Sequence, residues 1–167
     1  MRGRALVFFA AAAGLTAACE SSTDPAPTTY SATLLGANER PNPVTTSATG
    51  TFSATLGAND ILTYTLSFTG LSSNSTSAHI HGPIPATGNA AAGVLINFND
   101  PTLGRTITFG ATSGTGSGTI DLKLVATGNA NVSGDSLKVL LNNAKLYVNV
   151  HSTTNGGGEI LGNITKP

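Results

Sequence analysis

Apolar and polar residues alternate with a period of two along much of the chain from Tyr30 onward. In "TFSATL" (51–56), every second residue is apolar and the residues between are threonine or serine. Such alternation is typical of a strand with one buried and one solvent-facing side. The run "ILTYTLSFTGL" (61–71) repeats the pattern, and the turn residues "GAND" (57–60) lie between the two runs. We therefore predict a β-hairpin here.

The same pattern predicts several further strands. A first strand precedes the turn "GANE" at 36–39, and a glycine-rich run, "GTGSG" (114–118), is interpreted as a flexible hairpin turn. The remaining expected strands cover residues 77–82, 93–98, 105–110, 117–125, 145–151 and 158–165. Turn signals every eight to twelve residues favour an all-β fold, a Greek-key β-sandwich or barrel of about eight to nine strands.

One segment departs from the period of two. In 133–144, apolar residues recur at i, i+3, i+4 and i+7, which is the spacing of one helix face. These positions are Leu137, Leu140, Leu141 and Ala144. Ser133 or Asp135 is placed to cap the first turn. We therefore expect one short helix packed over one end of the β-structure.

The first residues follow a different pattern. Arg2 and Arg4 precede an apolar run at 5–15, which is too short to span a membrane as a helix. This arrangement predicts a signal peptide over residues 1–18. The run ends in "TAAC" at Cys19, which resembles a bacterial lipobox whose cysteine is lipidated.

The segment after Cys19 predicts how the chain is held at the membrane. Residues 19–29 are small, polar and proline-containing, as expected of a flexible tether, and the folded domain is expected over 30–167. This reading predicts an exported lipoprotein, anchored at the cell envelope in the periplasm or on the cell surface. Secretion without lipid is the alternative, and it would leave a solitary thiol in an oxidising compartment.

Composition excludes one class of partner. Only 10% of the 167 residues are charged, and the formal net charge is zero. A surface that binds nucleic acid must neutralise phosphates with clustered lysine and arginine, so nucleic acid is not an expected partner. The length fits a single domain with its own core. No serine lies in a GxSxG motif, so a hydrolase with that nucleophile is not indicated.

The three histidines are the main candidates for chemistry. His79 and His81 are two residues apart in "AHIHG", so on a strand both side chains point to the same side. In "LYVNVH", Tyr147, Asn149 and His151 project from the face opposite the apolar one. If the two strands are neighbours, the three imidazoles form a site suited to copper or zinc. The alternative is that the histidines only hydrogen-bond within the sheet.

Four other residues could support such a site. Tyr147 and Asn149 share its face, and two carboxylates, Glu39 and Glu159, are candidates to orient the ligands or act as general bases. For each carboxylate a simpler interpretation stays open. Glu39 would cap the turn after "GAN", and Glu159 would be a solvated charge at a strand edge.

Three blocks of the chain resemble the chordin-type (CHRD) domain family. They are "LLGANERPNPV" (34–44), "FTGLSSNSTSAHIHGPIPATGNAAAGVLINF" (68–98) and "LYVNVHSTTNGGGEILGNI" (146–164). The resemblance implies an extracytoplasmic β-sandwich-like module and no established activity for bacterial members. Gly156 and Leu161 stand where members often have proline and arginine, so a basic contact of the family is not expected here.

Three functions remain open on the sequence. The preferred hypothesis is an envelope-anchored module that binds a protein, a glycan or a metal ion without turnover. The alternative is a copper- or zinc-dependent redox enzyme that uses His79, His81 and His151. The third is a structural or adhesive domain in which the histidines take no part. Similarity of the HxH strand to copper/zinc superoxide dismutase is slight, because three histidines cannot supply both of that enzyme's metals.

Overall fold

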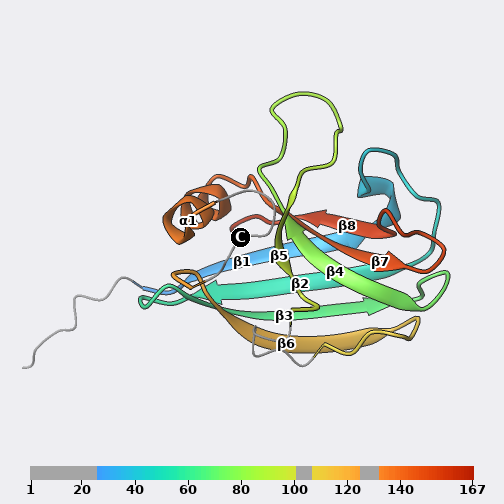
Figure 1. Cartoon of the computed structure of the whole chain (residues 1–167), viewed down its shortest axis with the longest axis horizontal. Coiled ribbons are helices and arrows are strands. Elements are labelled where there is room, and N and C mark those ends of the chain that lie inside the picture. Colours follow the sequence, from blue (N-terminus) through green and yellow to red (C-terminus); the bar gives the residue numbers. More distant parts are fainter. Residues whose placement is uncertain (1–25, 101–106, 125–131) are drawn as a thin grey trace, which may run out of the picture.

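The structure is a computed structural model, which describes residues 26–100, 107–124 and 132–167. Eight strands form one antiparallel sheet with the order β5-β4-β7-β8-β1-β2-β3-β6 (Figure 1). The strands are β1 (Thr28–Leu35), β2 (Thr49–Leu56), β3 (Ile61–Thr69), β4 (Ser75–His81), β5 (Val94–Asn97), β6 (Gly114–Asp121), β7 (Tyr147–Ser152) and β8 (Ile160–Asn163). The all-β prediction with one short helix is therefore confirmed, and the predicted hairpin is the β2–β3 pair.

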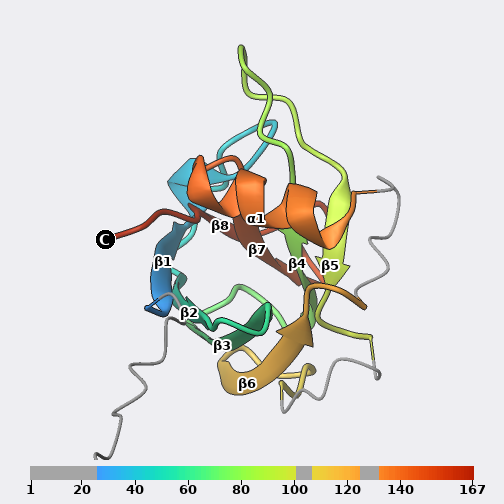
Figure 2. The same cartoon turned by 90° about the vertical axis from the view of Figure 1, so that its left-hand side faces the viewer.

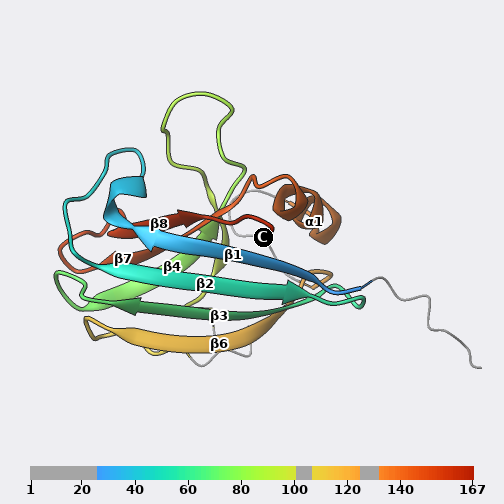
Figure 3. The same ribbon diagram turned by 180° about the vertical axis from the view of Figure 1, so that it is seen from behind.

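The sheet curls into a half-barrel, and the core fills its concave side. Viewed from one end, β1, β2, β3 and β6 form one wall and β8, β7, β4 and β5 form the other (Figure 2). Phe52, Tyr64 and Phe98 pack against one another inside, with ring centroids 4.8–6.3 Å apart. Period-two alternation places these side chains inward and leaves serine and threonine on the outer face of β1, β2 and β3, the side seen in Figure 3.

The helix α1 (Gly134–Asn142) lies across one end of the curled sheet (Figures 1 and 2). Ser133 is the N-cap, because its side chain accepts a hydrogen bond from the backbone N–H of Ser136. Leu137 and Leu141 are buried against the core, as the spacing predicts. At the other end of the helix, the hydroxyl of Tyr30 donates to Oδ1 of Asn142 at 2.9 Å, which ties α1 to β1.

The glycine-rich run 114–118 is a strand, so its interpretation as a hairpin turn is wrong. It begins β6, which pairs with β3 along its whole length. A Cβ at Gly116 would lie 2.4 Å from the backbone of Ile107, so the close approach of residues 107–109 requires glycine. Residues 107–110 are not in a strand, unlike the prediction for 105–110, and residues 105 and 106 of that prediction lie outside the described residues.

Strand β7 is buried on both faces, which was not expected from its alternating pattern. Its apolar side chains, Val148 and Val150, join the core. The opposite face is covered by the connections that follow β1 (36–48), β4 (82–93) and β7 (153–159). Two of them are joined where Nδ2 of Asn89 donates to the carbonyl oxygen of Pro41 at 2.7 Å. Loops thus enclose the outer face of β7 and the His81 end of β4, whereas Ser77 and His79 on β4 stay partly exposed.

Substitution of Ile80 by alanine tests the assignment of faces on β4. Ile80 is 1% exposed and belongs to the core cluster, between His79 and His81. Its truncation should lower the free energy of unfolding by about 3 kcal/mol, because buried methylene groups are lost and a cavity remains. Urea denaturation measures this change. A variant as stable as the wild type would mean that the faces are reversed.

The predicted export signal and lipid attachment at Cys19 fall on residues 1–25, which lie outside the described residues. Within the described ranges, no helix is both long and apolar enough to cross a membrane.

Candidate metal centre

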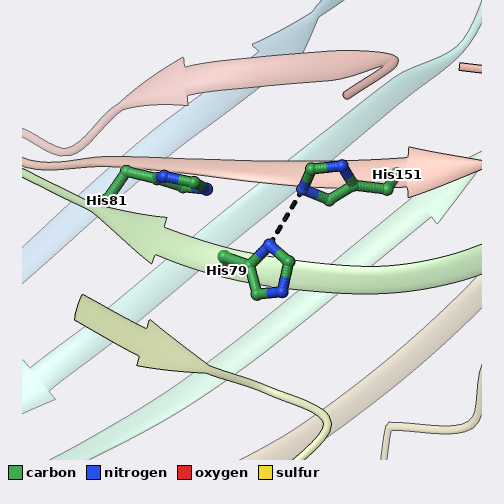
Figure 4. A group of neighbouring side chains, drawn as sticks. All are labelled: His79, His81 and His151. Atoms are coloured by element: carbon green, nitrogen blue, oxygen red, sulfur yellow. Dashed lines mark hydrogen bonds between the residues drawn. The ribbon is translucent and has the colours of Figure 1, made fainter. Parts of the chain in front are cut away.

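The three histidines meet on the outer face of β4 and β7 (Figure 4). Strands β4 and β7 are neighbours, with Ser77 opposite His151 and His79 opposite Asn149. One ring nitrogen from each of His79, His81 and His151 lies within 4.8 Å of the others. The clustering that the HxH spacing predicts is therefore confirmed. Three imidazole nitrogens at this separation could hold one metal ion.

Backbone carbonyl groups fix the orientation of two of the rings. Nδ1 of His81 lies 2.9 Å from the carbonyl oxygen of Ala92, and Nδ1 of His151 lies 3.0 Å from that of Gly156. A carbonyl oxygen only accepts, so each Nδ1 carries a proton and each Nε2 presents a lone pair. Metal-binding histidines are commonly oriented in this way.

The lone pairs of the two oriented rings face the site. Nε2 of His81 is buried and has no hydrogen-bond partner within the described part of the chain. Nε2 of His151 lies 2.9 Å from Nδ1 of His79, which therefore donates to it (Figure 4). His79 is the most exposed of the three. It is half-buried, whereas His81 and His151 are each only 8% exposed. An ion would reach the buried pair from the side of His79.

Burial keeps all three imidazoles neutral. Together with charge repulsion from the neighbouring His151 and His81, it lowers the pKa of His79 to about 4. Burial also lowers the pKa of His81 and of His151, although their carbonyl partners oppose the effect. Neutral imidazole is the form that binds a metal ion, so protons compete weakly for this site at pH 7.

Tyr147 supports the ring of His81. The two rings stack with centroids 4.9 Å apart and an interplanar angle of 5°. The Tyr147 hydroxyl accepts a hydrogen bond from the backbone N–H of Ala92 at 3.0 Å, next to the carbonyl group that holds His81. The guanidinium of Arg40 lies 5.8 Å from the centroid of the Tyr147 ring, within range of a cation–π contact. Tyr147 therefore bears on the position of the His81 ring.

Glu39 is buried near the site but does not touch the histidines directly. Its side chain is 3% exposed, and burial raises its pKa to about 7. The N–H of Arg40 donates to Oε1 at 3.1 Å, and the amide of Asn149 faces the same carboxyl group; both lower the pKa. The interpretation as a turn residue also holds in part, since the backbone N–H of Glu39 closes the 3-10 turn η1 (Gly36–Asn38).

Gly158 makes room for the Glu39 carboxyl group. A Cβ at position 158 would lie 2.6 Å from the carboxyl carbon of Glu39, and the backbone has a φ of +126° there. Glycine is therefore required at 158 both for space and for backbone conformation.

Glu159 is not a solvated charge at a strand edge. It is 0% exposed and accepts hydrogen bonds from the Thr46 hydroxyl, the Ser72 N–H and hydroxyl, and the Ser152 hydroxyl. Burial alone would raise its pKa, but these donors outweigh burial and lower it to about 2. Its partners belong to three separate segments, so Glu159 holds these segments together and does not hydrogen-bond to a histidine among the described residues.

Sequence reasoning missed two kinds of contribution to the site. The carbonyl groups of Ala92 and Gly156 leave no side-chain signal, because any residue supplies a carbonyl oxygen. Arg40 could have been noticed, since it follows Glu39 and precedes a proline in a block of low charge. Its Nε is buried, and it has no hydrogen-bond partner among the residues that the structure describes.

Comparison with known proteins gives one match. The sequence model of the CHRD domain matches residues 30–164, which is nearly all of the described structure. No curated protein and no solved structure matches the chain. The match includes His79, His81 and His151 together with Glu39, Tyr147, Asn149 and Glu159.

Proposed function

The chain belongs to the CHRD domain family, and we propose that this member binds one copper or zinc ion through His79, His81 and His151, without turnover. The observation that carries the proposal is the buried group of three ring nitrogens within 4.8 Å of one another. Imidazole suits both copper and zinc, whereas magnesium and calcium prefer oxygen ligands.

Three further properties support a metal centre over three unrelated histidines. Two rings are held by backbone carbonyl groups with their Nε2 lone pairs turned inward. The third ring, that of His79, completes the group from β4, two residues before His81. Burial favours the neutral form of all three. Placing a neutral nitrogen such as Nε2 of His81 in a buried site without a partner is costly unless a ligand satisfies it.

The proposed location is outside the cytoplasm, anchored to the membrane of the cell envelope by lipid on Cys19. The support is the order of features at the N-terminus: two arginines, an apolar run, small residues and the single cysteine of the chain. In that setting the module would act on a metal ion, an envelope protein or a surface glycan. Of these three ligands, only the metal ion has an identified binding site, and it is the one we propose.

A redox metalloenzyme is the second candidate. The partial exposure of His79 favours it, because a catalytic metal must be reached by its substrate. Both candidates predict bound metal, and only the enzyme predicts turnover.

Elemental analysis of the purified, untagged protein tests the proposal. Before and after loading with copper or zinc, the wild type should contain one equivalent of metal, and the His79→Ala/His151→Ala double variant should contain none. Ser77→Ala is the matched control, because Ser77 lies on β4 directly opposite His151 and offers no imidazole. Circular dichroism checks that each variant is folded. Absence of stoichiometric metal from the wild type under both conditions would overturn the proposal.

A further inference from the structure

Asn149 lies beside His79 and His151, on the strand face that carries the three histidines. It is directly opposite His79 across the β4–β7 pair, and it precedes His151 by two residues on the same face of β7. Opposite residues of an antiparallel pair have Cβ atoms about 5 Å apart. The side chain is only 2% exposed. Its position is thus fixed by the same two strands that position the ligands.

The oxygen of Asn149 faces the lone pair of a histidine. Oδ1 lies 3.1 Å from Nε2 of His151. Nδ1 of His151 carries the proton of the neutral ring, because its partner is the carbonyl oxygen of Gly156. Nε2 is therefore an acceptor, and so is Oδ1. Two acceptors at this distance repel each other. In the metal-free protein the Nδ1–H of His79 donates to Nε2, and a bound cation would take the place of that proton and contact both acceptors.

The position of Glu39 accounts for the orientation of the Asn149 side-chain amide. If the amide were rotated, its NH₂ group would donate to His151 and its oxygen would face Glu39. The carboxylate of Glu39 accepts hydrogen bonds and is buried at 3% exposure, so it needs a donor. Oε1 of Glu39 accepts from the Arg40 N–H, and Oε2 is buried without a hydrogen-bond partner among the described residues. An N–H of Asn149, whose side-chain amide lowers the pKa of Glu39, is the donor that this carboxyl group favours. Glu39 thereby keeps Oδ1 of Asn149 turned toward the histidines.

We propose that Oδ1 of Asn149 is the fourth ligand of the metal ion, so that the site is a closed, four-coordinate His₃-amide centre for a divalent ion, Zn²⁺ or Cu²⁺. This inference rests on the proposed function, since it needs the three histidines to bind a metal. An amide oxygen is a harder ligand than imidazole and favours a divalent ion over Cu⁺. Closed sites are structural or storage sites, whereas catalytic sites keep a position open for water.

Azide binding tests whether a coordination position is open. The wild type is loaded with Co²⁺ or Cu²⁺, and azide is added while the absorption spectrum is recorded. The wild-type spectrum should not change, because no position is free. In Asn149→Ala, water should occupy the vacated position, azide should replace it, and the spectrum should shift. Affinity for the metal should fall about tenfold or more in this variant.

Two further variants complete the experiment. Asn149→Asp keeps an oxygen in place and should exclude azide as the wild type does. Asn97→Ala is the matched control, because Asn97 is the neighbour of His79 on its other side, in β5, and is exposed. It should leave both affinity and the azide response unchanged.

The outcomes separate this inference from the proposed function. Stoichiometric metal that depends on the histidines, together with a wild-type spectrum that azide shifts, would overturn the fourth ligand and leave the three-histidine site standing. A wild type that binds no metal would overturn both. The wild-type measurement decides the point even if Asn149→Ala does not fold.

Discussion

In metal-free protein, the free energy of unfolding should fall as the pH is lowered from 6.5 to 4. The fall should be about 3 kcal/mol larger for the wild type than for His79→Gln. The pKa of His79 is about 4 in the folded protein and 6.5 in an unfolded chain. Between these values the unfolded state binds the proton and the folded state does not, so falling pH favours unfolding. Each unit of pKa difference corresponds to about 1.4 kcal/mol. The contribution of the neutral His79 ring to stability is therefore fully present above pH 6.5.

The comparison must be made between variants, because Glu39 acts in the opposite direction. Its pKa is raised to about 7 in the folded state, so its contribution falls as the pH rises from 4.5 to 7. Urea denaturation of wild type and His79→Gln, with chelator present, from pH 7.5 to pH 4 gives the difference. Glu39 contributes equally to both proteins and cancels. A difference that stays constant with pH would show that His79 is not held neutral by burial.

Glu159→Gln should lower the free energy of unfolding by about 3 kcal/mol at pH 7. The Glu159 carboxylate accepts hydrogen bonds from Thr46, Ser72 and Ser152, and they lower its pKa from 4.5 to about 2. A depressed carboxylate pKa contributes stability that is present above pH 4.5 and lost as the pH falls toward 2. Glutamine has the same shape but no charge, so it loses that contribution at every pH.

Urea denaturation at pH 7 and at pH 2–3 measures this effect. The wild type and Glu159→Gln should differ at pH 7 and converge near pH 2, where the wild-type carboxyl group is protonated. Asp135→Asn is the control, because the side chain of Asp135 is 91% exposed and its removal should cost less than about 0.5 kcal/mol. A gap between wild type and Glu159→Gln that persists unchanged at pH 2 would point to packing rather than to charge.

Most of the β-structure could be predicted because the relevant signal is local. Alternation places Ile80 in the core and His79 and His81 together on the other face, and the structure confirms both. The capping residue and the leucine spacing predicted α1, with both ends within two residues of those observed. The glycine-rich start of β6 could not be predicted in this way, although the strand expected at 117–125 overlaps its second half. Gly114 and Gly116 are needed because other segments pack closely against them, as Phe68 does on Gly114 and Ile107 does on Gly116.

The burial of the polar side chains could not be predicted from the sequence for the same reason. Glu159 follows three glycines, which is typical of an exposed turn, yet loops from residues 46 and 72 enclose it. Likewise, the pattern of β7 predicts a polar outer face, and the connections after β1 and β4 cover that face. Local alternation predicts which way a side chain points. It does not predict which loop will lie over it.

The carbonyl groups that hold His81 and His151 also bear on how this protein tolerates sequence change. Ala92 and Gly156 fix the ring protons through main-chain atoms, and their own side chains take no part in that contact. Residues at these two positions can therefore be exchanged over evolutionary time without altering the protonation of the rings, provided that the backbone path is kept. Length changes in either loop would be far more damaging, since they would move the oxygen atom itself.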